Sequence, residues 1–296
     1  MEFIKGLLRR ICGVLYRIAA TVMVHTLPPR LWYRAAFLSA RVQAEILRPL
    51  AVVGLYPFRR DIEAWPERRK VVLARLMDSW LRYIAEFRLS FPIPVRIQSV
   101  PPLESLPTNG CGIVFCTVHI FLVNACLKAV LEASRHDLTV ISGVPELGNE
   151  CPVYGLNRSI PAIFADTTVL LKMKRILLRG GSVAVLVDKG IGAPLAANSL
   201  RLARIVGARL FFGAPELQAN GEILLAGCEA PDLQTGGEES VQLTLEALQA
   251  QRDRILRVSS RTGTGQMSAA DDWPDAARKR GARPLNKRPS RDEAAL

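Results

Sequence analysis

A histidine and an asparagine five residues apart are the side chains whose types and spacing best fit catalysis. His119 follows a short apolar run at residues 112–116, and Asn124 opens an apolar stretch with a helical pattern. A free imidazole titrates near pH ~6.5, which suits a general base that deprotonates a hydroxyl. Such a base must be held in one tautomer and stabilised once it is protonated, and a carboxylate does both. The amide of Asn124 can accept a hydrogen bond from the ring, but it carries no negative charge.

A lone histidine in an apolar setting is more often structural than catalytic. Three features favour a functional role for His119: a strand before it, a helix after it and a polar residue five positions on. We therefore expect His119 to act as a general base, with Asn124 as its polar partner.

Alternating strand and helix patterns surround this pair and must position it. Apolar residues recur at helical spacing over residues 66–89, which predicts a core helix. Beyond it we predict strands at 112–116, 138–142, 182–187, 210–212 and 222–225, and helices at 124–134, 163–178, 195–206 and 239–258. This alternation predicts an α/β fold whose mixed, largely parallel sheet is flanked by helices. Sites in such sheets form at the carboxyl ends of strands, where His119, Gly143 and Asp188 all fall.

Charge and hydropathy divide the chain into three segments. The net charge is +12, and residues 1–70 supply +8 of it with thirteen Lys/Arg and five Asp/Glu. Because this segment is also apolar, we expect it to bind anionic membrane lipids rather than nucleic acid. Residues 1–60 are predicted to be a basic, hydrophobic, membrane-associated helical segment, 61–258 an α/β domain, and 259–296 a disordered basic tail. For residues 11–27, an interfacial helix, a single membrane span and an ordinary packed helix all stay open.

The cysteines predict neither a metal site nor a disulfide framework. The chain has six of them, none in a Cys-x-x-Cys pair, and Cys111, Cys116 and Cys126 lie in apolar surroundings typical of small core residues. We expect no metal and no bound cofactor.

Four short segments, in order, resemble one enzyme family. His119-X4-Asn124 before a helix resembles the His-X4-Asp/Glu signature of the lysophospholipid acyltransferase superfamily. Over about residues 65–230 the chain resembles, more specifically, the bacterial lauroyl/myristoyl acyltransferases of lipid A biosynthesis. The matching segments are Gly-Leu-Asn-Arg at 155–158, Leu-Arg-Gly-Gly-Ser-Val at 178–183, Val-Asp-Lys at 187–189 and Leu-Ala-Arg-Ile-Val-Gly-Ala at 202–208. The sequence departs from the family at Asn124, and after Asp188, where Gly-Ile-Gly replaces an aromatic-Phe-Gly segment.

The resemblance implies a membrane enzyme on the cytoplasmic face of a bacterial inner membrane. It would move a fatty acyl group from acyl-carrier protein or acyl-CoA to a hydroxyl of a glycolipid or lysolipid. By position, His119 would be the general base, and Asn124 would occupy the orienting position. Arg158 would contact phosphate or phosphopantetheine or stabilise the oxyanion, while Asp188 and Lys189 would line the cleft.

Two other functions stay open. The uncharged Asn124 is consistent with a catalytically weakened homologue that binds lipid or a partner at the membrane. The basic charge is also consistent with a peripheral binding protein of unrelated α/β fold.

Overall fold

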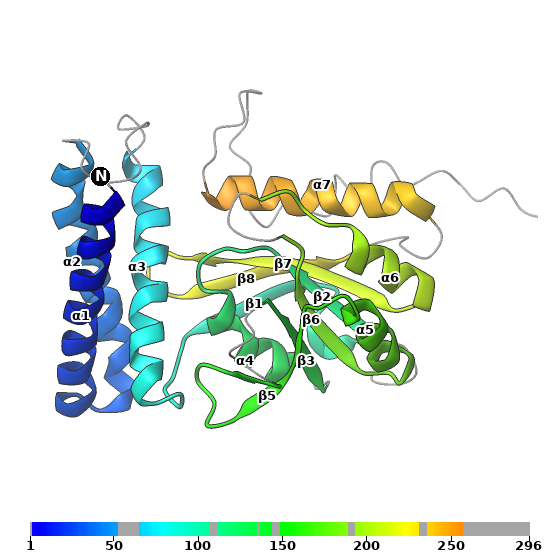
Figure 1. Ribbon diagram of the computed structural model, residues 1–296, viewed down its shortest axis with the longest axis horizontal. Coiled ribbons are helices and arrows are strands. Elements are labelled where there is room, and N and C mark those ends of the chain that lie inside the picture. The colour runs from blue at the N-terminus through cyan, green and yellow to red at the C-terminus, as the bar shows by residue number, and fades with distance from the viewer. Residues whose placement is uncertain are drawn as a thin grey trace, which may run out of the picture. The chain divides into compact units, whose positions relative to one another are not determined.

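Three long helices form the N-terminal part of the protein and pack against one another (Figure 1). The computed structural model describes residues 2–52, 65–106, 112–134, 137–143, 149–188, 193–230 and 236–256. The helices are α1 (Glu2–Thr26), α2 (Pro29–Val52) and α3 (Trp65–Phe87). Pro29 opens α2, a position where its missing N–H costs nothing. Ala36, Ala40 and Ala44 are fully buried at four-residue spacing, so α2 can approach α3 closely.

One mixed sheet of eight strands lies beside these helices in the described part of the chain. The strands are β1 (Val95–Val100), β2 (Ile113–Thr117), β3 (Leu138–Ser142), β4 (Glu150–Pro152), β5 (Ser159–Phe164), β6 (Ser182–Leu186), β7 (Arg209–Leu217) and β8 (Ile223–Glu229). Their order across the sheet is β1-β8-β7-β2-β6-β3-β5-β4. Every pairing is parallel except β7–β8 and β4–β5.

Helices cover both faces of the sheet (Figure 1). These are α4 (Val123–Ser134), α5 (Val169–Leu178), α6 (Asn198–Val206) and α7 (Gly237–Leu256), with a short 3₁₀ turn, η2, at Leu103–Ser105. The connections β2–α4–β3 and β6–α6–β7 run in opposite directions across the sheet, and right-handed crossovers therefore put α4 and α6 on opposite faces. The predicted α/β fold with a largely parallel sheet is confirmed.

Several predicted boundaries differ from the structure. The pattern at 163–178 was expected to be a single helix, but β5 occupies its start and α5 begins only at Val169. In β5 the burial alternates, with Ile160 and Ala162 buried. The segment therefore forms its backbone hydrogen bonds as a strand beside β3. Helix α6 starts at Asn198 rather than at Leu195, because Leu195 bridges Asp188. Strands β1 and β4 had no predicted counterpart, and half of the residues in β1 are exposed, as expected at a sheet edge.

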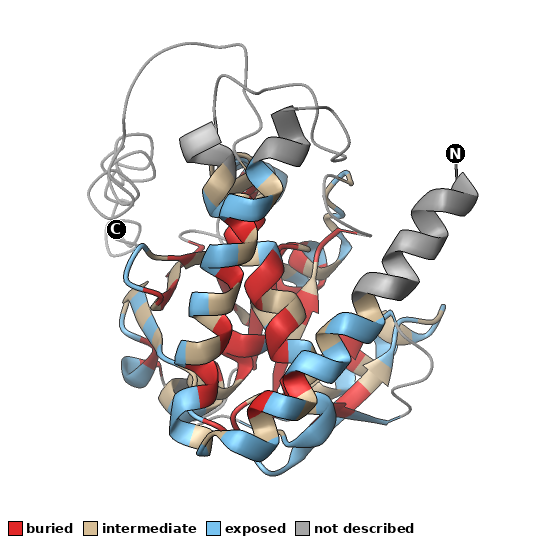
Figure 2. Ribbon diagram, turned by 90° about the vertical axis from the view of Figure 1, so that its left-hand side faces the viewer, coloured by how far each residue is buried: buried red, intermediate tan, exposed pale blue. Residues whose placement is uncertain are grey.

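The N-terminal helices share a hydrophobic core with the sheet. Met77 and Ile84 of α3 are fully buried, and they belong to one cluster with Leu217 of β7 and Ile223 of β8. Figure 2 shows the buried residues on the inner sides of these helices and the exposed residues on their outer sides. A second cluster fills the space around α4, η2 and strands β2 to β5.

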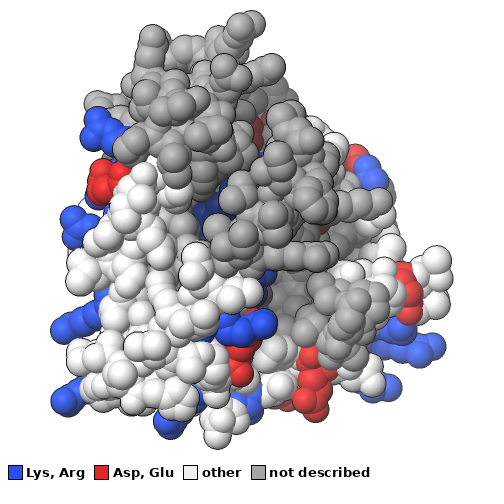
Figure 3. Space-filling view, turned by 60° about the vertical axis from the view of Figure 1, so that its left-hand side comes forward, with Lys and Arg blue, Asp and Glu red and all other residues white. Residues whose placement is uncertain are grey.

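The outer sides of α1 and α2 carry large apolar side chains. The exposed ones are Val14, Leu15, Ile18 and Val22 on α1 and Leu31, Leu38, Val42 and Ile46 on α2. Uncharged surface dominates this side of the protein, with Lys and Arg side chains around it (Figure 3). None of the described helices combines the length and apolar character needed to cross a membrane. The predicted tail at 259–296 lies outside the described residues.

Candidate active site

His119 lies at the carboxyl edge of the sheet, next to a buried aspartate. Thr117, the last residue of β2, pairs with Leu186 of β6, and this register brings His119 level with Asp188. The Oδ1 atom of Asp188 accepts a hydrogen bond from the His119 backbone N–H at 2.7 Å and contacts ring Nδ1 at 2.7 Å. The Asp188 side chain is 0% exposed, whereas the His119 side chain is 38% exposed. The histidine can therefore meet a substrate, and the aspartate cannot.

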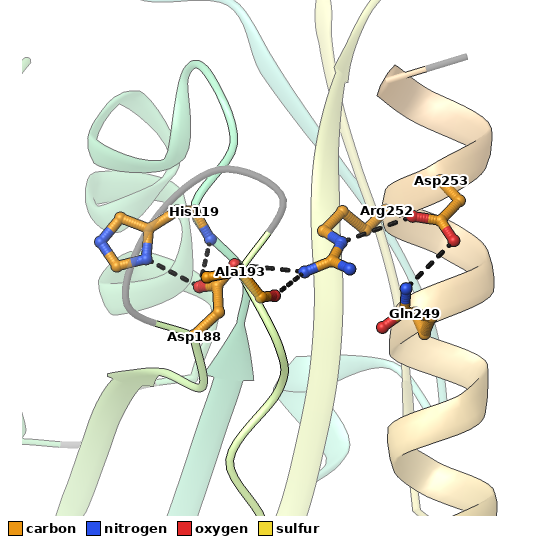
Figure 4. A network of polar contacts seen from close by, with 6 residues as sticks. All are labelled: His119, Asp188, Ala193, Gln249, Arg252 and Asp253. Carbon is orange, nitrogen blue, oxygen red and sulfur yellow. Dashed lines mark hydrogen bonds and ion pairs between the residues drawn. The ribbon is translucent and has the colours of Figure 1, made fainter. Parts of the chain in front are cut away.

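This contact sets the tautomer of the ring. A carboxylate oxygen only accepts hydrogen bonds. Nδ1 therefore carries the ring proton and donates a hydrogen bond to Asp188. The other nitrogen, Nε2, keeps its lone pair and points away from Asp188 (Figure 4). A ring in this state can take a proton from a hydroxyl or a water, and the carboxylate behind it stabilises the resulting imidazolium.

The second oxygen of Asp188 faces an arginine from the last described helix. Arg252 of α7 is buried, and its Nη1 atom lies 3.6 Å from Asp188 Oδ2. The same Nη1 donates a hydrogen bond to the backbone carbonyl of Ala193. Behind it, Arg252 Nε lies 3.5 Å from Asp253 Oδ1, and Gln249 hydrogen-bonds the other oxygen of Asp253 at 3.2 Å. These residues form one polar chain from α7 to the imidazole (Figure 4).

A strained turn separates His119 from α4. Leu122 is buried and has φ +72°, a backbone conformation rare for a residue with a branched side chain. Its N–H donates to Asp78 Oδ1 of α3 at 2.9 Å, which fixes the turn. Burial raises the pKa of Asp78 above 3.8, and the hydrogen bond from Leu122 and the charge of Arg82 oppose part of this rise.

The strained turn explains why Asn124 does not orient the base. Helix α4 begins only at Val123, so His119 and Asn124 do not share a helical face. The Asn124 side chain is exposed, and no hydrogen bond joins these two described residues. The structure brings Asp188, not Asn124, into contact with the imidazole.

Arg158 is not brought to His119 either. It directly precedes β5, and the parallel register puts the start of β5 level with the start of β2. His119 follows the other end of β2, so the two residues lie roughly 26 Å apart along the strand direction at ~3.3 Å per residue. Arg158 is exposed at the amino edge of the sheet, and the predicted cleft residue Lys189 lies outside the described residues.

Sequence reasoning missed Arg252, although a signal was present. The inward face of α7 carries Val241, Thr244 and Leu248 at helical spacing, and Arg252 continues this stripe. Arginine is rarely fully buried unless it is paired, so its position indicates a buried anion. Nothing in the local pattern says that the anion is Asp188.

The described residues contain no group of three or more His, Cys, Asp or Glu that could hold a metal ion. Cys116, Cys126 and Cys151 are free thiols inside the protein, and Cys228 is buried as well. Burial raises the pKa of Cys126 to about 12, so this thiol stays protonated and inert at neutral pH. Cys111 lies outside the described residues.

No family model and no curated protein sequence matches this chain. Its function must therefore be inferred from its own residues.

Proposed function

We propose that this protein is a membrane-associated acyltransferase. It moves a fatty acyl group from acyl-carrier protein or acyl-CoA to a hydroxyl of a glycolipid or lysolipid, at the cytoplasmic face of a bacterial inner membrane. The observation that carries the proposal is the His119–Asp188 contact at the carboxyl edge of the sheet, with Nε2 pointing away from Asp188. A His–Asp pair can serve several reactions, and the acyltransferase-like segments between residues 65 and 230 favour acyl transfer among them.

The proposed step uses Nε2 of His119 as the general base. Nε2 takes the proton from the acceptor hydroxyl, and the oxygen attacks the thioester carbonyl of the donor. The tetrahedral intermediate collapses by breaking the C–S bond, and the imidazolium returns the proton to the leaving thiolate. The products are an O-acyl ester and a free thiol, so no oxidant or metal is consumed. General base catalysis of this kind contributes about 10²–10⁴-fold to the rate.

Asp188 supplies the charge that Asn124 lacks. Its carboxylate contacts Nδ1 at 2.7 Å and is shielded from water. The possibility of a catalytically weakened homologue depended on an uncharged orienting residue. Asn124→Asp is therefore expected to change the turnover rate less than twofold, whereas a large gain would favour the weakened homologue.

The outer sides of α1 and α2 support membrane association. Their exposed apolar residues recur at three- and four-residue steps, and exposed arginines such as Arg34 and Arg41 lie among them. Apolar side chains can enter the region between headgroups and acyl chains while arginines bind anionic headgroups. Binding of this kind would bring the protein to the interface where a lipid acceptor lies.

Activity can be tested with purified protein in mixed micelles. Acyl-CoA or acyl-carrier protein is supplied with candidate lysolipid and glycolipid acceptors, and thiol release and acceptor mass are both measured. His119→Ala is expected to lower the turnover rate at least 10²-fold. Asn124→Ala is the matched control, because its side chain is exposed and makes no contact with the ring. Full activity in His119→Ala would rule out histidine as the base.

Lipid mass spectrometry of cells with and without the gene can identify the acceptor. A lipid lighter by one acyl group in the deletion strain would give both the acceptor and the chain length. An unchanged lipid profile, together with no transfer in vitro, would count against the enzyme proposal.

Membrane binding can be tested by flotation with anionic phosphatidylglycerol vesicles. Ile18→Glu together with Leu38→Glu should release the protein, because each change puts a charge on an exposed apolar position. Ile205→Glu is the matched control: Ile205 is 72% exposed on α6, away from α1 and α2. Equal flotation of all three proteins would show that α1 and α2 do not bind the membrane.

A further inference from the structure

Arg252 occupies a position that ordinary helix packing does not explain. Its side chain is 4% exposed, and it lies within a stripe of α7 otherwise made of apolar and uncharged residues. A neighbouring contact fixes the register of this helix, because Gln251 donates a hydrogen bond to the Ala226 carbonyl of β8 at 3.0 Å. The guanidinium is thereby directed at the carboxyl edge of the sheet.

The guanidinium contacts both ends of the segment that joins β6 to α6. Nη1 faces Asp188 Oδ2 at 3.6 Å at the end of β6, and it donates to the Ala193 carbonyl ahead of α6. Asp188 Oδ2 has no hydrogen-bond partner in the described part of the protein. Arg252 is therefore the cation beside this oxygen, while Oδ1 is occupied by His119.

We infer that Arg252 is a positioning residue of the active site. It holds the Asp188 carboxylate in one orientation, with Oδ2 toward α7 and Oδ1 toward the imidazole. A buried carboxylate without a counter-charge favours its neutral form, which donates a hydrogen bond and no longer fixes the ring tautomer. Arg252 does not touch substrate, and it acts on the base only through Asp188.

The inference depends on the proposed function only for its kinetic readout. An independent readout is the ring Nδ1–H proton of His119, which a short hydrogen bond to a carboxylate shifts far downfield in the ¹H NMR spectrum. The downfield signal is assigned by its loss in His119→Ala. It reports the Asp188–His119 contact whether or not the protein transfers acyl groups.

The test compares Arg252→Met, which removes the charge, with Arg252→Lys, which keeps it. Arg252→Met should lose the downfield signal and lower kcat at least tenfold with little change in KM, because the base is misplaced while the substrate contacts remain. Arg252→Lys should keep the signal and most of kcat. Arg254→Met is the matched control, since Arg254 lies two residues on in α7 and is not the arginine that contacts Asp188 and Ala193.

A double-mutant cycle measured by thermal unfolding distinguishes this role from a general effect on folding, and it needs no substrate. If Arg252 serves as the counter-charge of Asp188, Arg252→Met should lower Tm more in the wild-type background than in the Asp188→Asn background. Equal losses of Tm in both backgrounds would overturn the inference, as would an unchanged downfield signal in Arg252→Met. If Arg252→Lys loses the signal as completely as Arg252→Met, shape rather than charge positions Asp188, and the inference fails. If the downfield signal is lost in Arg252→Met and kept in Arg252→Lys, but the wild type transfers no acyl group, the proposed reaction is refuted and the positioning role stands.

Discussion

Replacing Asp188 with asparagine is expected to remove the charge that stabilises His119 once it is protonated. The Oδ1 position of residue 188 accepts the His119 backbone N–H at 2.7 Å, whereas Arg252 faces the Oδ2 position at 3.6 Å. An asparagine there keeps its carbonyl oxygen at the Oδ1 position, because its NH₂ group would otherwise meet this backbone donor at hydrogen-bond distance. Ring Nδ1 still donates to that oxygen, so Nε2 keeps its lone pair. The neutral amide cannot stabilise the imidazolium that forms when Nε2 takes a proton, so the base is weakened.

The size of the effect follows from these contacts. The substitution removes the negative charge 2.7 Å from Nδ1. General base catalysis contributes about 10²–10⁴-fold, and the same change in a serine-protease triad, where the tautomer also becomes wrong, costs about 10⁴-fold. Because the tautomer is retained here, we expect kcat to fall on the order of 10²-fold, which corresponds to about 3 kcal/mol of transition-state stabilisation. KM should change little, because Asp188 is shielded from substrate.

The assay measures thiol release under donor saturation, with Asp166→Asn as the matched control. Asp166 is a partly exposed carboxylate after β5 that bonds Lys172 and Thr168, and neither bond involves His119. Because breaking a buried ion pair costs about 3–5 kcal/mol, each variant must first be shown to be folded by circular dichroism at the assay temperature.

Two outcomes would refute this reasoning. If Asp188→Asn keeps its activity while His119→Ala loses it, another group must orient the base. If Asp166→Asn lowers kcat as much as Asp188→Asn does, the loss of activity reflects general damage to this edge of the sheet. The tautomer itself can be read from ring ¹⁵N shifts, which should show Nδ1–H in both Asp188→Asn and the wild type.

Three further predictions concern the scaffold. Burial raises the pKa of Asp78 above 3.8, so ionisation of this carboxyl favours the unfolded chain. The resulting loss of folded-state stability grows as pH rises from 3.8 toward the folded-state pKa. Asp78→Asn does not titrate, so its stability relative to the wild type should increase from pH ~3.5 to pH 7 in urea titrations; a pH-independent difference would contradict this. Cys126, whose pKa burial raises to about 12, should react with a maleimide only after denaturation, as peptide mass spectrometry can check. Ala40→Leu should destabilise the protein by about 1–3 kcal/mol by forcing α2 away from α3, and unchanged thermal unfolding would refute that packing.

Local sequence patterns were sufficient for the fold class and for the position of His119. The spacing of apolar residues in α3 and the β-branched run in β6 identify these elements, because helix and strand periods are local properties. A histidine after a buried strand was likewise readable from neighbouring residues. Boundaries were less predictable where a tertiary contact overrides the local pattern, as at β5 and at Leu195.

The partners of His119 were decided by tertiary structure. Asn124 is five residues from His119 in sequence, but a positive φ at Leu122, held by Asp78 from another helix, separates them. Asp188 is 69 residues away and becomes the partner because β2 and β6 pair in a register that brings it level with His119. Sequence alone thus determined that a histidine would stand at the carboxyl edge of a sheet. Which carboxylate holds it depends on strand order and register, which no local pattern encodes.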